Sequence, residues 1–308
     1  MEKIYKKELF LSKIKTLYPD RFKKIIYCIN QNIFTSFRVN NIVSSTGEVT
    51  AGLKKLGFII EEGPFANSFK VLSYPENFKL SETKYFDEGK IYIQNLSSMI
   101  PALILNPIPG ENILDLCAAP GSKTSQIADL SHNNANIFAV ESNKSRFFAM
   151  KKSFQNQGLD KIVTIKARAE DLPRMKPSWV GYFDKILCDV PCTNEGLIRN
   201  PDSYDFNYWN PKNAKRLSQL QKKILAAGIL LLKKEGTLVY STCTFSMGEN
   251  EKVIEWALKK FPDISLEEVG LSLPCAIDGL TKDTIKTKRV LPDENFEAFF
   301  VAKLGKLK

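Results

Sequence analysis

The sequence predicts an α/β protein with a mostly parallel, doubly wound sheet, preceded by a small N-terminal α+β domain. From residue 112 onward, short apolar segments alternate with segments whose apolar residues recur every three or four positions. This alternation is typical of strands that are buried on both faces and joined by helices. The first 85 residues lack that regularity. We therefore expect a small module over residues 1–85 and a larger domain over residues 86–308.

The N-terminal module is predicted to mix helices and short strands. Helical spacing of apolar residues runs over residues 4–33, with a break at the "YPD" of residues 18–20. A strand in "TSFRVNNIV", a short helix in "VTAGLKKLGF" that ends at Gly57, and a strand in "SFKVL" follow. The segment "YIQNLSSMIPALIL", residues 92–105, gives a short strand and then a helix that stops before Pro107.

The later segments read as strands and helices in turn. The predicted strands are "NILDLC", "NIFAVE", "IVTIKA", "FDKILCDV", "GTLVYSTC" and "FEAFFVAKL". Ligands of such sheets bind outside the carboxyl ends of the strands. Asp115, Glu141, Asp189 and Cys243 lie at or near those ends. We therefore expect these four residues at the edge of the sheet where a ligand would bind.

Charge and composition narrow the class of protein. The chain carries a net charge of +10, and residues 1–40 hold nine Lys or Arg against three acids. A basic lobe favours a polyanionic partner, nucleic acid first, although a solvated lysine-rich face is an equal alternative. There is no run of about 18 apolar residues to span a membrane, and the six cysteines show no spacing framework of a secreted disulfide protein. We expect a cytoplasmic monomer without a membrane segment.

The stretch "DLCAAPGSKT", residues 115–124, predicts a strand, a tight turn and a helix start, whose backbone N–H groups can meet a polar ligand. Glu141 follows Gly121 by twenty residues and ends the next strand, where an acid suits paired ribose hydroxyls. A nicotinamide cofactor is disfavoured because G-x-G-x-x-G is absent, and a phosphate loop because Ser122 precedes Lys123. S-adenosylmethionine, which has a ribose and no diphosphate, fits best. An ordinary βα turn is the alternative.

Four motifs carry a family resemblance. "DLCAAPGSKT", "DVPCTNEG" (189–196), "YSTCTFSMGEN" (240–250) and "RVLPDENFEAFFVAKL" resemble, in the same order, the motif series of the NOL1/NOP2/Sun family of RNA cytosine-5 methyltransferases, of the RsmB/RsmF-like kind. "FRVNNI" and "YIQNLSSMIPALIL" also resemble that family's N-terminal module and first catalytic helix. The resemblance covers residues 35–305. The pair of Pro-Cys and Thr-Cys motifs is highly specific, and the cofactor turn is less so.

The sequence departs from the family pattern in the Pro-Cys motif and after the predicted strand "IVTIKA". Val190 replaces the usual Ala, and two residues separate Thr193 from Gly196. Where the family usually has an acid near the adenine, alignment places Ala167 or Arg168. The cofactor-binding residues expected from the turn and the resemblance are Cys117, Ala118, Ala119, Pro120, Gly121, Ser122, Lys123, Glu141, Arg146, Arg168 and Asp189.

The resemblance implies covalent catalysis by a cysteine. Addition of a thiolate to carbon 6 of cytosine makes carbon 5 nucleophilic. Cys243 is then the nucleophile, Cys192 assists release of the product, Asp189 contacts the ring nitrogen N3, and Lys123 orients or charge-balances Asp189. The implied partner is RNA, either rRNA or tRNA. No metal is expected, because the only histidine, His132, lies in a polar loop.

Other interpretations stay open. A DNA cytosine methyltransferase would place its nucleophile at Cys192, and a catalytically silent RNA-binding factor would need neither cysteine. Free cysteines are often small buried hydrophobes, and this is our expectation for Cys28, Cys117, Cys188 and Cys275. Aromatic residues of the N-terminal module could stack on RNA bases, although helical spacing favours the core for most of them: Tyr5, Phe10, Tyr18, Phe22, Phe34 and Phe37. Arg199, Asn200 and Asp202 could line the pocket for the target base.

Overall fold

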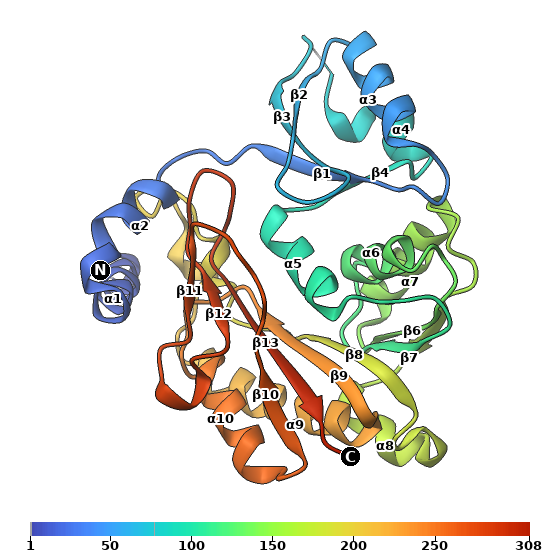
Figure 1. Ribbon diagram of the computed structural model, residues 1–308. Coiled ribbons are helices and arrows are strands. Elements are labelled where there is room, and N and C mark those ends of the chain that lie inside the picture. Colours follow the sequence, from blue (N-terminus) through green and yellow to red (C-terminus); the bar gives the residue numbers. More distant parts are fainter. Residues whose placement is uncertain (1, 77) are drawn as a thin grey trace.

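A computed structural model describes residues 2–76 and 78–308 of the chain, without the side chains of Glu2 and Lys3 (Figure 1). Lys3, one of the nine basic residues of the N-terminal segment, therefore has its side chain outside the described part. Within that part, the strands form a four-stranded sheet of order β2-β3-β1-β4 and a nine-stranded sheet of order β11-β12-β13-β9-β8-β5-β6-β7, with β10 paired to β13. The small sheet lies above the larger one in Figure 1.

The small sheet is antiparallel and has helices on one face. Its strands are β1 (Thr35–Val39), β2 (Ile59–Glu62), β3 (Ser68–Ser73) and β4 (Ile91–Ile93), and its helices are α3 (Thr46–Lys55) and α4 (Lys84–Asp87). Side chains alternate between the faces of a strand. Phe37 and Val39 of β1 accordingly join the core under the helices. Arg38 points the other way, donates to Gln94 and Ser125, and so ties the small sheet to the larger domain.

Helices α1 (Glu2–Leu17) and α2 (Phe22–Ile29) do not pack on the small sheet. Phe10 lies with its ring centroid 5.7 Å from that of Phe206 and 6.2 Å from that of Phe245, and Tyr18 packs in the same cluster. These partners belong to the larger domain. We therefore propose that the small domain comprises residues 35–93, and that the first two helices belong structurally with the larger domain.

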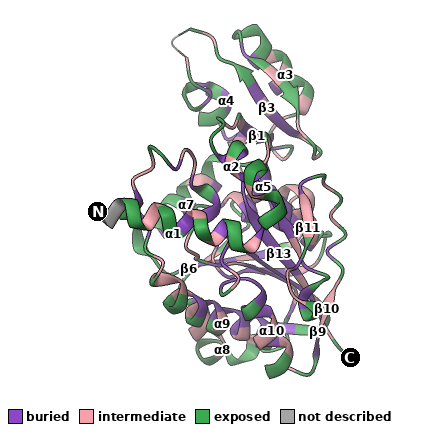
Figure 2. Cartoon of the chain, turned by 90° about the vertical axis from the view of Figure 1, so that its left-hand side faces the viewer, coloured by how far each residue is buried: buried purple, intermediate pink, exposed green. Residues whose placement is uncertain are grey.

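The larger sheet has a parallel centre covered on both faces. The parallel strands are β5 (Asn112–Asp115), β6 (Asn136–Glu141), β7 (Val163–Lys166), β8 (Phe183–Asp189) and β9 (Leu232–Thr242). One face packs on α5 (Leu96–Leu105), α6 (Ser122–Leu130) and α7 (Lys144–Asn156). The other face packs on α8 (Leu172–Met175), α9 (Asn213–Leu231) and α10 (Glu251–Lys260). The predicted doubly wound α/β fold is confirmed, and buried residues concentrate in these strands (Figure 2).

One side of the larger sheet is antiparallel. β13 (Phe299–Lys306) pairs with β9, and β12 (Lys288–Val290), β11 (Ala276–Asp278) and β10 (Ile264–Glu267) extend the sheet beyond it. The sequence predicts only β13 among these four. The other three have three or four residues each and are partly exposed, so they give no clear apolar alternation.

The strand ends of the parallel centre meet at one edge. β5 ends at Asp115, β6 at Glu141 and β8 at Asp189, and Cys243 follows the end of β9. Asp189 pairs in register with Ser241, so the last residues of β8 and β9 lie next to each other. The predicted gathering of these four residues at one edge is therefore confirmed.

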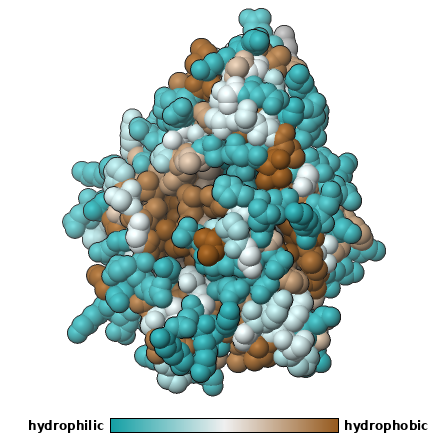
Figure 3. Space-filling model, turned by 45° about the vertical axis from the view of Figure 1, so that its right-hand side comes forward, coloured by the Kyte–Doolittle hydropathy of each residue, from teal (hydrophilic) through white to brown (hydrophobic). Residues whose placement is uncertain are grey.

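None of the helices in the described part of the chain combines the length and apolar character needed to cross a membrane. On the molecular surface, apolar side chains gather in a hollow below the small domain, and hydrophilic residues surround it (Figure 3).

Candidate active site

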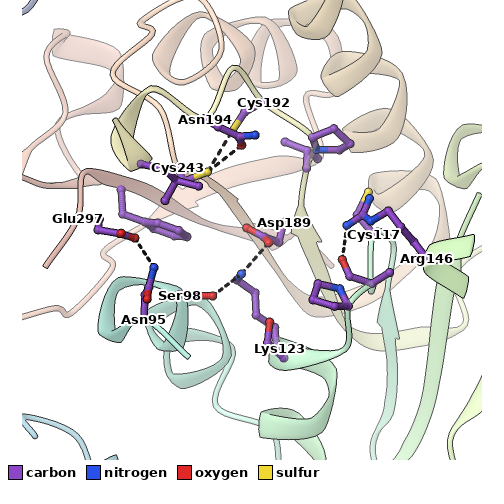
Figure 4. A pocket seen from close by; sticks show the side chains of 17 residues that line it. Asn95, Ser98, Cys117, Lys123, Arg146, Asp189, Cys192, Asn194, Cys243 and Glu297 are labelled. Carbon is purple, nitrogen blue, oxygen red and sulfur yellow. Dashed lines mark hydrogen bonds and ion pairs between the residues drawn. The ribbon is translucent and has the colours of Figure 1, made fainter. Parts of the chain in front are cut away.

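A cavity of about 410 Å³ opens at the carboxyl ends of the parallel strands (Figure 4). A second cavity of about 390 Å³ adjoins it and shares Cys117, Arg146 and Pro191 with it. Of the residues predicted for the site, the first cavity is lined by Cys117, Ala119, Pro120, Ser122, Lys123, Arg146, Asp189, Cys192 and Cys243. Glu141 and Arg168 line the second cavity. Ala118 and Gly121 line neither, because both are held inside the turn.

The turn after β5 is braced by Asp115, which is buried. Its carboxylate accepts hydrogen bonds from Thr124 Oγ1 at 2.6 Å and from the backbone N–H of Cys117 at 3.2 Å. Burial raises the pKa of Asp115 to about 6. Gly121 has a φ of +108° and leads into α6, and a Cβ there would lie 2.8 Å from the ring of Phe154. The turn thus needs glycine at this position both for its backbone and for its packing.

Glu141 lines the second cavity. Its Oε1 accepts from the backbone N–H of Asn143 at 2.7 Å, and its Oε2 lies 3.3 Å from Nη1 of Arg146. Arg146 also donates to the carbonyl oxygen of Ala119, so it links the strand end of β6 to the turn after β5. Arg168 is exposed and pairs with Glu170 at 2.6 Å.

Lys123 and Asp189 form an ion pair within the first cavity. Lys123 Nζ lies 2.7 Å from Asp189 Oδ2 and donates to Ser98 Oγ at 2.8 Å, and Ser241 Oγ donates to the other carboxylate oxygen of Asp189 at 2.7 Å. Burial alone would lower the pKa of Lys123, but the neighbouring Asp189 carboxylate raises it above its ordinary value. The lysine is therefore a cation, and the contact expected between these two residues is present.

The two motif cysteines face each other. Their sulfur atoms lie 3.4 Å apart, well beyond the roughly 2.05 Å of a disulfide bond, so both are free thiols. Asn194 Oδ1 lies 3.1 Å from Cys243 Sγ and 3.4 Å from Cys192 Sγ (Figure 4). The hydrogen bond with Cys243, together with burial, raises the pKa of Cys192 well above its ordinary value. The surroundings of Cys192 thus favour its protonated form.

Buried polar side chains join the loop that carries Cys192 to the loop that carries Cys243. Glu249 accepts from the backbone N–H of Thr193 and from Gln221, both at 3.0 Å. Thr193 Oγ1 lies 2.7 Å from Thr244 Oγ1, and the backbone N–H of Gly196 donates to the carbonyl of Cys243 at 2.9 Å. A Cβ at Gly196 would lie 2.2 Å from the carbonyl oxygen of Ala298, so this close approach requires glycine.

Sequence reasoning missed several residues that line the first cavity: Asn95, Ser98, Asn194, Leu197, Glu297 and Phe299. Asn95 donates to Glu297 at 2.6 Å, which joins the start of α5 to the start of β13. The only local signal was the acid within the apolar "FEAFF" segment. The contact itself spans about two hundred residues of sequence and could not be read from spacing.

Three residues expected near the target base lie elsewhere. Arg199 donates to the backbone carbonyls of Cys28 and Phe296, and therefore fixes the end of α2. Asp202 is exposed and pairs with Lys7. Asn200 donates its backbone N–H to Ile29. None of Arg199, Asn200 and Asp202 lines the first cavity.

The other cysteines and the N-terminal aromatics divide by burial. Cys28, Cys188 and Cys275 are buried, as expected, but Cys117 lies between the two cavities. Phe10, Tyr18 and Phe37 are core residues, and Phe22 is partly buried against the same cluster as Phe10. Tyr5 and Phe34 are exposed. The core interpretation is therefore correct for most of the six.

Comparison with known proteins places this geometry in a family. The family described as 16S rRNA methyltransferase RsmB/F matches residues 102–305. The tRNA (cytosine(49)-C(5))-methyltransferase of Pyrococcus abyssi is 34% identical over 282 residues, which cover 88% of this chain and 88% of that protein. The human tRNA (cytosine(72)-C(5))-methyltransferase NSUN6 is 39% identical over 186 residues, which cover 58% of this chain and 39% of that protein.

A solved structure agrees over the whole chain. A methyltransferase homolog protein from Pyrococcus horikoshii has a TM-score of 0.84 and 31% identity, covering 100% of this chain and 98% of that one. The Rossmann-like methyltransferase fold is therefore shared from the first helices to the last strand. The resemblance carried by the four motifs is confirmed, and the chain belongs to the RsmB/F family of methyltransferases.

Proposed function

We propose that this protein transfers a methyl group from S-adenosylmethionine to carbon 5 of a cytosine in RNA. One observation carries the proposal: two free thiols face each other at 3.4 Å beside the Lys123–Asp189 ion pair, within one cavity. The relatives reported above are named as RNA cytosine-C5 methyltransferases, which supports the reaction. Since the chain spans only 39% of the human relative, the RNA acted on is part of the proposal.

The second cavity fits the nucleoside part of S-adenosylmethionine. Glu141 offers carboxylate oxygens that can accept from two ribose hydroxyls. Leu220, Ile224 and Ala167 supply apolar walls for a flat ring. The turn at Cys117 to Lys123 borders the first cavity, where the reactive end would meet the cysteines. When bound, S-adenosylmethionine supplies the electrophilic methyl group.

The residues of the first cavity fit the rest of the reaction. The Cys243 thiolate adds to carbon 6 of cytosine, and the ring then carries electron density at carbon 5. Asp189, held by Lys123 and Ser241, is assigned to contact N3 after it has taken up a proton, because only the neutral carboxyl can donate a hydrogen bond that stabilises the negative charge developing on the ring. After methylation a base takes the carbon 5 proton, the electrons of that carbon–hydrogen bond re-form the carbon 5–carbon 6 double bond, and the carbon 6–sulfur bond breaks to return Cys243 as the thiolate.

The surroundings of Cys192 support a role for it other than nucleophilic attack. The raised pKa of Cys192 keeps it protonated while Cys243 attacks. We assign to Cys192 the release step, in which the adduct on Cys243 is resolved. A cavity of this size at a sheet edge takes a base that is unpaired or flipped out of a helix.

An adduct assay with labelled cofactor tests these roles. The Cys243→Ala variant should lose both methyl transfer and any covalent adduct, because no sulfur bonds to carbon 6. The Cys192→Ala variant should attack and methylate once, then accumulate a protein–RNA adduct that survives denaturing electrophoresis and that requires the cofactor. Cys275→Ala, a buried cysteine outside the cavity, is the matched control and should turn over normally.

The opposite pattern would change the assignment. An adduct in Cys243→Ala with none in Cys192→Ala would favour the DNA-type arrangement, in which Cys192 attacks. Full turnover without adduct in both variants would remove both cysteines from the chemistry. Binding of RNA without any methyl transfer by the unmodified chain would favour the silent binding factor.

The choice between rRNA and tRNA is tested by mapping 5-methylcytosine in RNA from a strain that lacks the gene. The matched family is described by 16S rRNA, whereas the two relatives reported above are named for tRNA. Loss of one modified site in rRNA or in tRNA would identify the substrate. The cytoplasmic location and monomeric state expected from the sequence stay predictions.

A further inference from the structure

Four side-chain oxygens form a continuous chain beneath the two cysteine loops. Glu249 Oε1 lies 2.7 Å from Thr193 Oγ1, Thr193 Oγ1 lies 2.7 Å from Thr244 Oγ1, and Thr244 Oγ1 lies 3.0 Å from Glu195 Oε2. Glu195, Thr244 and Glu249 are each at most 1% exposed. Thr193 directly follows Cys192, and Thr244 directly follows Cys243. The middle contact of the chain therefore joins the two loops that carry the thiols.

The number of hydrogens available to these four oxygens limits how they can be hydrogen-bonded. Three oxygen–oxygen contacts at hydrogen-bond distance need three hydrogens, and the two threonine hydroxyls supply one each. The third hydrogen has to come from a carboxyl group. Glu195 is not the source, because Lys13 Nζ lies 2.6 and 2.7 Å from its two oxygens and keeps it ionised.

Glu249 has the surroundings of a neutral acid. Its Oε2 accepts two N–H groups, from the Thr193 backbone and from Gln221, which suits the carbonyl oxygen of a carboxylic acid. Its Oε1 faces only the hydroxyl of Thr193. Within the described part of the chain, no cationic side chain is paired with this carboxyl.

We propose that Glu249 is held as the neutral carboxylic acid and that its proton locks the Cys192 loop to the Cys243 loop. Glu249 then donates to Thr193 Oγ1, Thr193 donates to Thr244 Oγ1, and Thr244 donates to Glu195 Oε2. Every oxygen in the chain is satisfied in this arrangement, as buried polar groups require. Glu249 is thus a positioning residue for both thiols, and it lines neither of the two cavities.

The neighbouring groups favour the neutral form. Burial raises the pKa of Glu249, and the negative charge of Glu195 adds to that increase. The other titratable groups around it are Cys192, whose thiol keeps its proton, and Tyr240, whose hydroxyl donates to the backbone carbonyl of Glu249 at 2.6 Å. Lys13 is paired with Glu195, at the other end of the row of hydrogen-bonded oxygens from Glu249.

Loss of the Glu249 proton should break the lock. Two hydroxyl hydrogens would then serve two carboxylates, and charge-assisted hydrogen bonds are stronger than neutral ones. Thr193 would turn to Glu249 and Thr244 to Glu195, which leaves two lone pairs facing each other between the loops. The separation of the thiols therefore becomes sensitive to high pH. Its consequence for product release depends on the proposed function, whereas the lock itself does not.

The test uses the full chain without RNA or cofactor and compares Glu249→Gln, Glu249→Ala and the control Glu268→Gln, the same substitution at an exposed glutamate. Infrared spectroscopy should find a protonated carboxyl band that disappears in Glu249→Gln and persists in the control. The second readout is closure of Cys192 with Cys243 by the thiol oxidant diamide, followed by mass. In that reaction two thiols lose two hydrogens to form a disulfide, and the diazene is reduced to a hydrazine.

The expected closure rates follow from the geometry. Glutamine can donate an amide N–H to Thr193 Oγ1 and accept with its oxygen, so Glu249→Gln should match the unmodified chain near pH 6. The closure rate of the unmodified chain, divided by that of Glu249→Gln, should fall as the pH rises. Only the unmodified chain has a proton to lose at position 249. The Glu249→Ala variant should close at least about fivefold more slowly than Glu249→Gln at every pH, as expected for a lost buried hydrogen bond.

Two results would overturn the proposal. One is an infrared spectrum in which Glu249→Gln loses no protonated carboxyl band. The other is a Glu249→Gln variant that closes as slowly as Glu249→Ala at all pH values, which would mean that an ionised Glu249 is needed. If Glu249→Ala does not fold, the comparison of Glu249→Gln with Glu268→Gln decides alone. Failure of the adduct assay with intact infrared and closure results would count only against the proposed function.

Discussion

The ammonium nitrogen of Lys13 lies 2.6 Å from Oε1 and 2.7 Å from Oε2 of Glu195, so an ion pair joins the first helix of the chain to the loop that carries Cys192. Glu195 is buried, and it also accepts from Trp209 Nε1 and from Thr244. Lys7 is likewise paired with Asp202. Lys7, Lys13 and the buried Arg38 of the basic N-terminal segment thus have partners within the protein, so the expected RNA contacts do not rest on these three.

Removal of the Lys13 cation should destabilise the fold. The Lys13→Met variant leaves the Glu195 carboxylate buried without its partner, which typically costs about 3 kcal/mol or more for a buried pair. Part of the Lys13 side chain is exposed, so the loss should lie at the lower end of that range. Urea unfolding measures it. Lys15→Met, an exposed lysine on the same helix, is the control for charge loss.

The double variant separates the charge pair from simple packing. Lys13→Met combined with Glu195→Gln should recover most of the lost stability, because no charge is then left buried. If the double variant is as unstable as the sum of the two single variants, the pair contributes nothing beyond the separate side chains.

Binding to RNA should depend on exposed lysines at the start of α2. Lys23 and Lys24 are exposed, and their reversal in Lys23→Glu/Lys24→Glu should weaken binding and flatten its dependence on salt. Each lost phosphate contact reduces the slope of log affinity against log salt by about 0.7–0.9. Fluorescence anisotropy over a salt series measures both effects. The same reversal at Lys259 and Lys260, at the end of α10, is the control; equal losses in both variants would point to net charge alone.

Affinity for S-adenosylmethionine should fall when Glu141 is shortened. Hydrogen bonds to a charged group contribute about 1.5–3 kcal/mol each, so Glu141→Ala should weaken binding by more than about tenfold. Calorimetry on the chain without RNA gives the affinity directly. Glu268→Gln should bind normally. An unchanged affinity in Glu141→Ala would remove this residue from the ribose site.

Asp115 should make the stability fall between about pH 4 and pH 6. Its pKa in the folded protein is about 6 and is raised by burial, so the folded state binds a proton more tightly than the unfolded chain, whose carboxyl has a pKa near 3.9. The stabilisation is complete below about pH 4 and is lost as the pH rises through about 6. With about 1.4 kcal/mol per pKa unit, the full change is roughly 3 kcal/mol.

The matched variant for this prediction is Asp115→Asn. Its oxygen can still accept from the backbone N–H of Cys117, and its amide can donate to Thr124 Oγ1, so the turn keeps both contacts. Urea unfolding of both proteins from pH 4 to 7 gives the difference in stability, in which other titrations cancel. A difference that does not change with pH would show that Asp115 is already ionised throughout this range.

The parallel centre of the fold and its strand ends could be predicted because each strand is a continuous apolar run that stops at a polar signature. Asp115, Glu141, Asp189 and Cys243 each follow such a run. In a parallel sheet, the topology alone brings those positions to one edge. The pairing of Lys123 with Asp189 could be predicted for the same reason, since the turn after β5 lies beside the end of β8.

The remaining features depend on contacts that no local pattern records. The packing of α1 on the larger domain depends on Phe206 and Phe245, about two hundred residues away in sequence. Amphipathic spacing shows that Phe10 is buried but not against what. Likewise, the position of Asn194 between the two sulfurs follows from a left-handed backbone conformation with φ of +55°, which asparagine tolerates and which spacing does not reveal.

The long-range packing of α1 has a consequence for synthesis on the ribosome. Phe10 needs Phe206 and Phe245, and Tyr18 needs Arg289. Those partners emerge roughly two hundred or more residues later. At about 5–20 residues per second, the nascent helix waits on the order of 10–50 s with its apolar face uncovered. We therefore expect the first helix to be accessible to chaperones during translation and to dock late in folding.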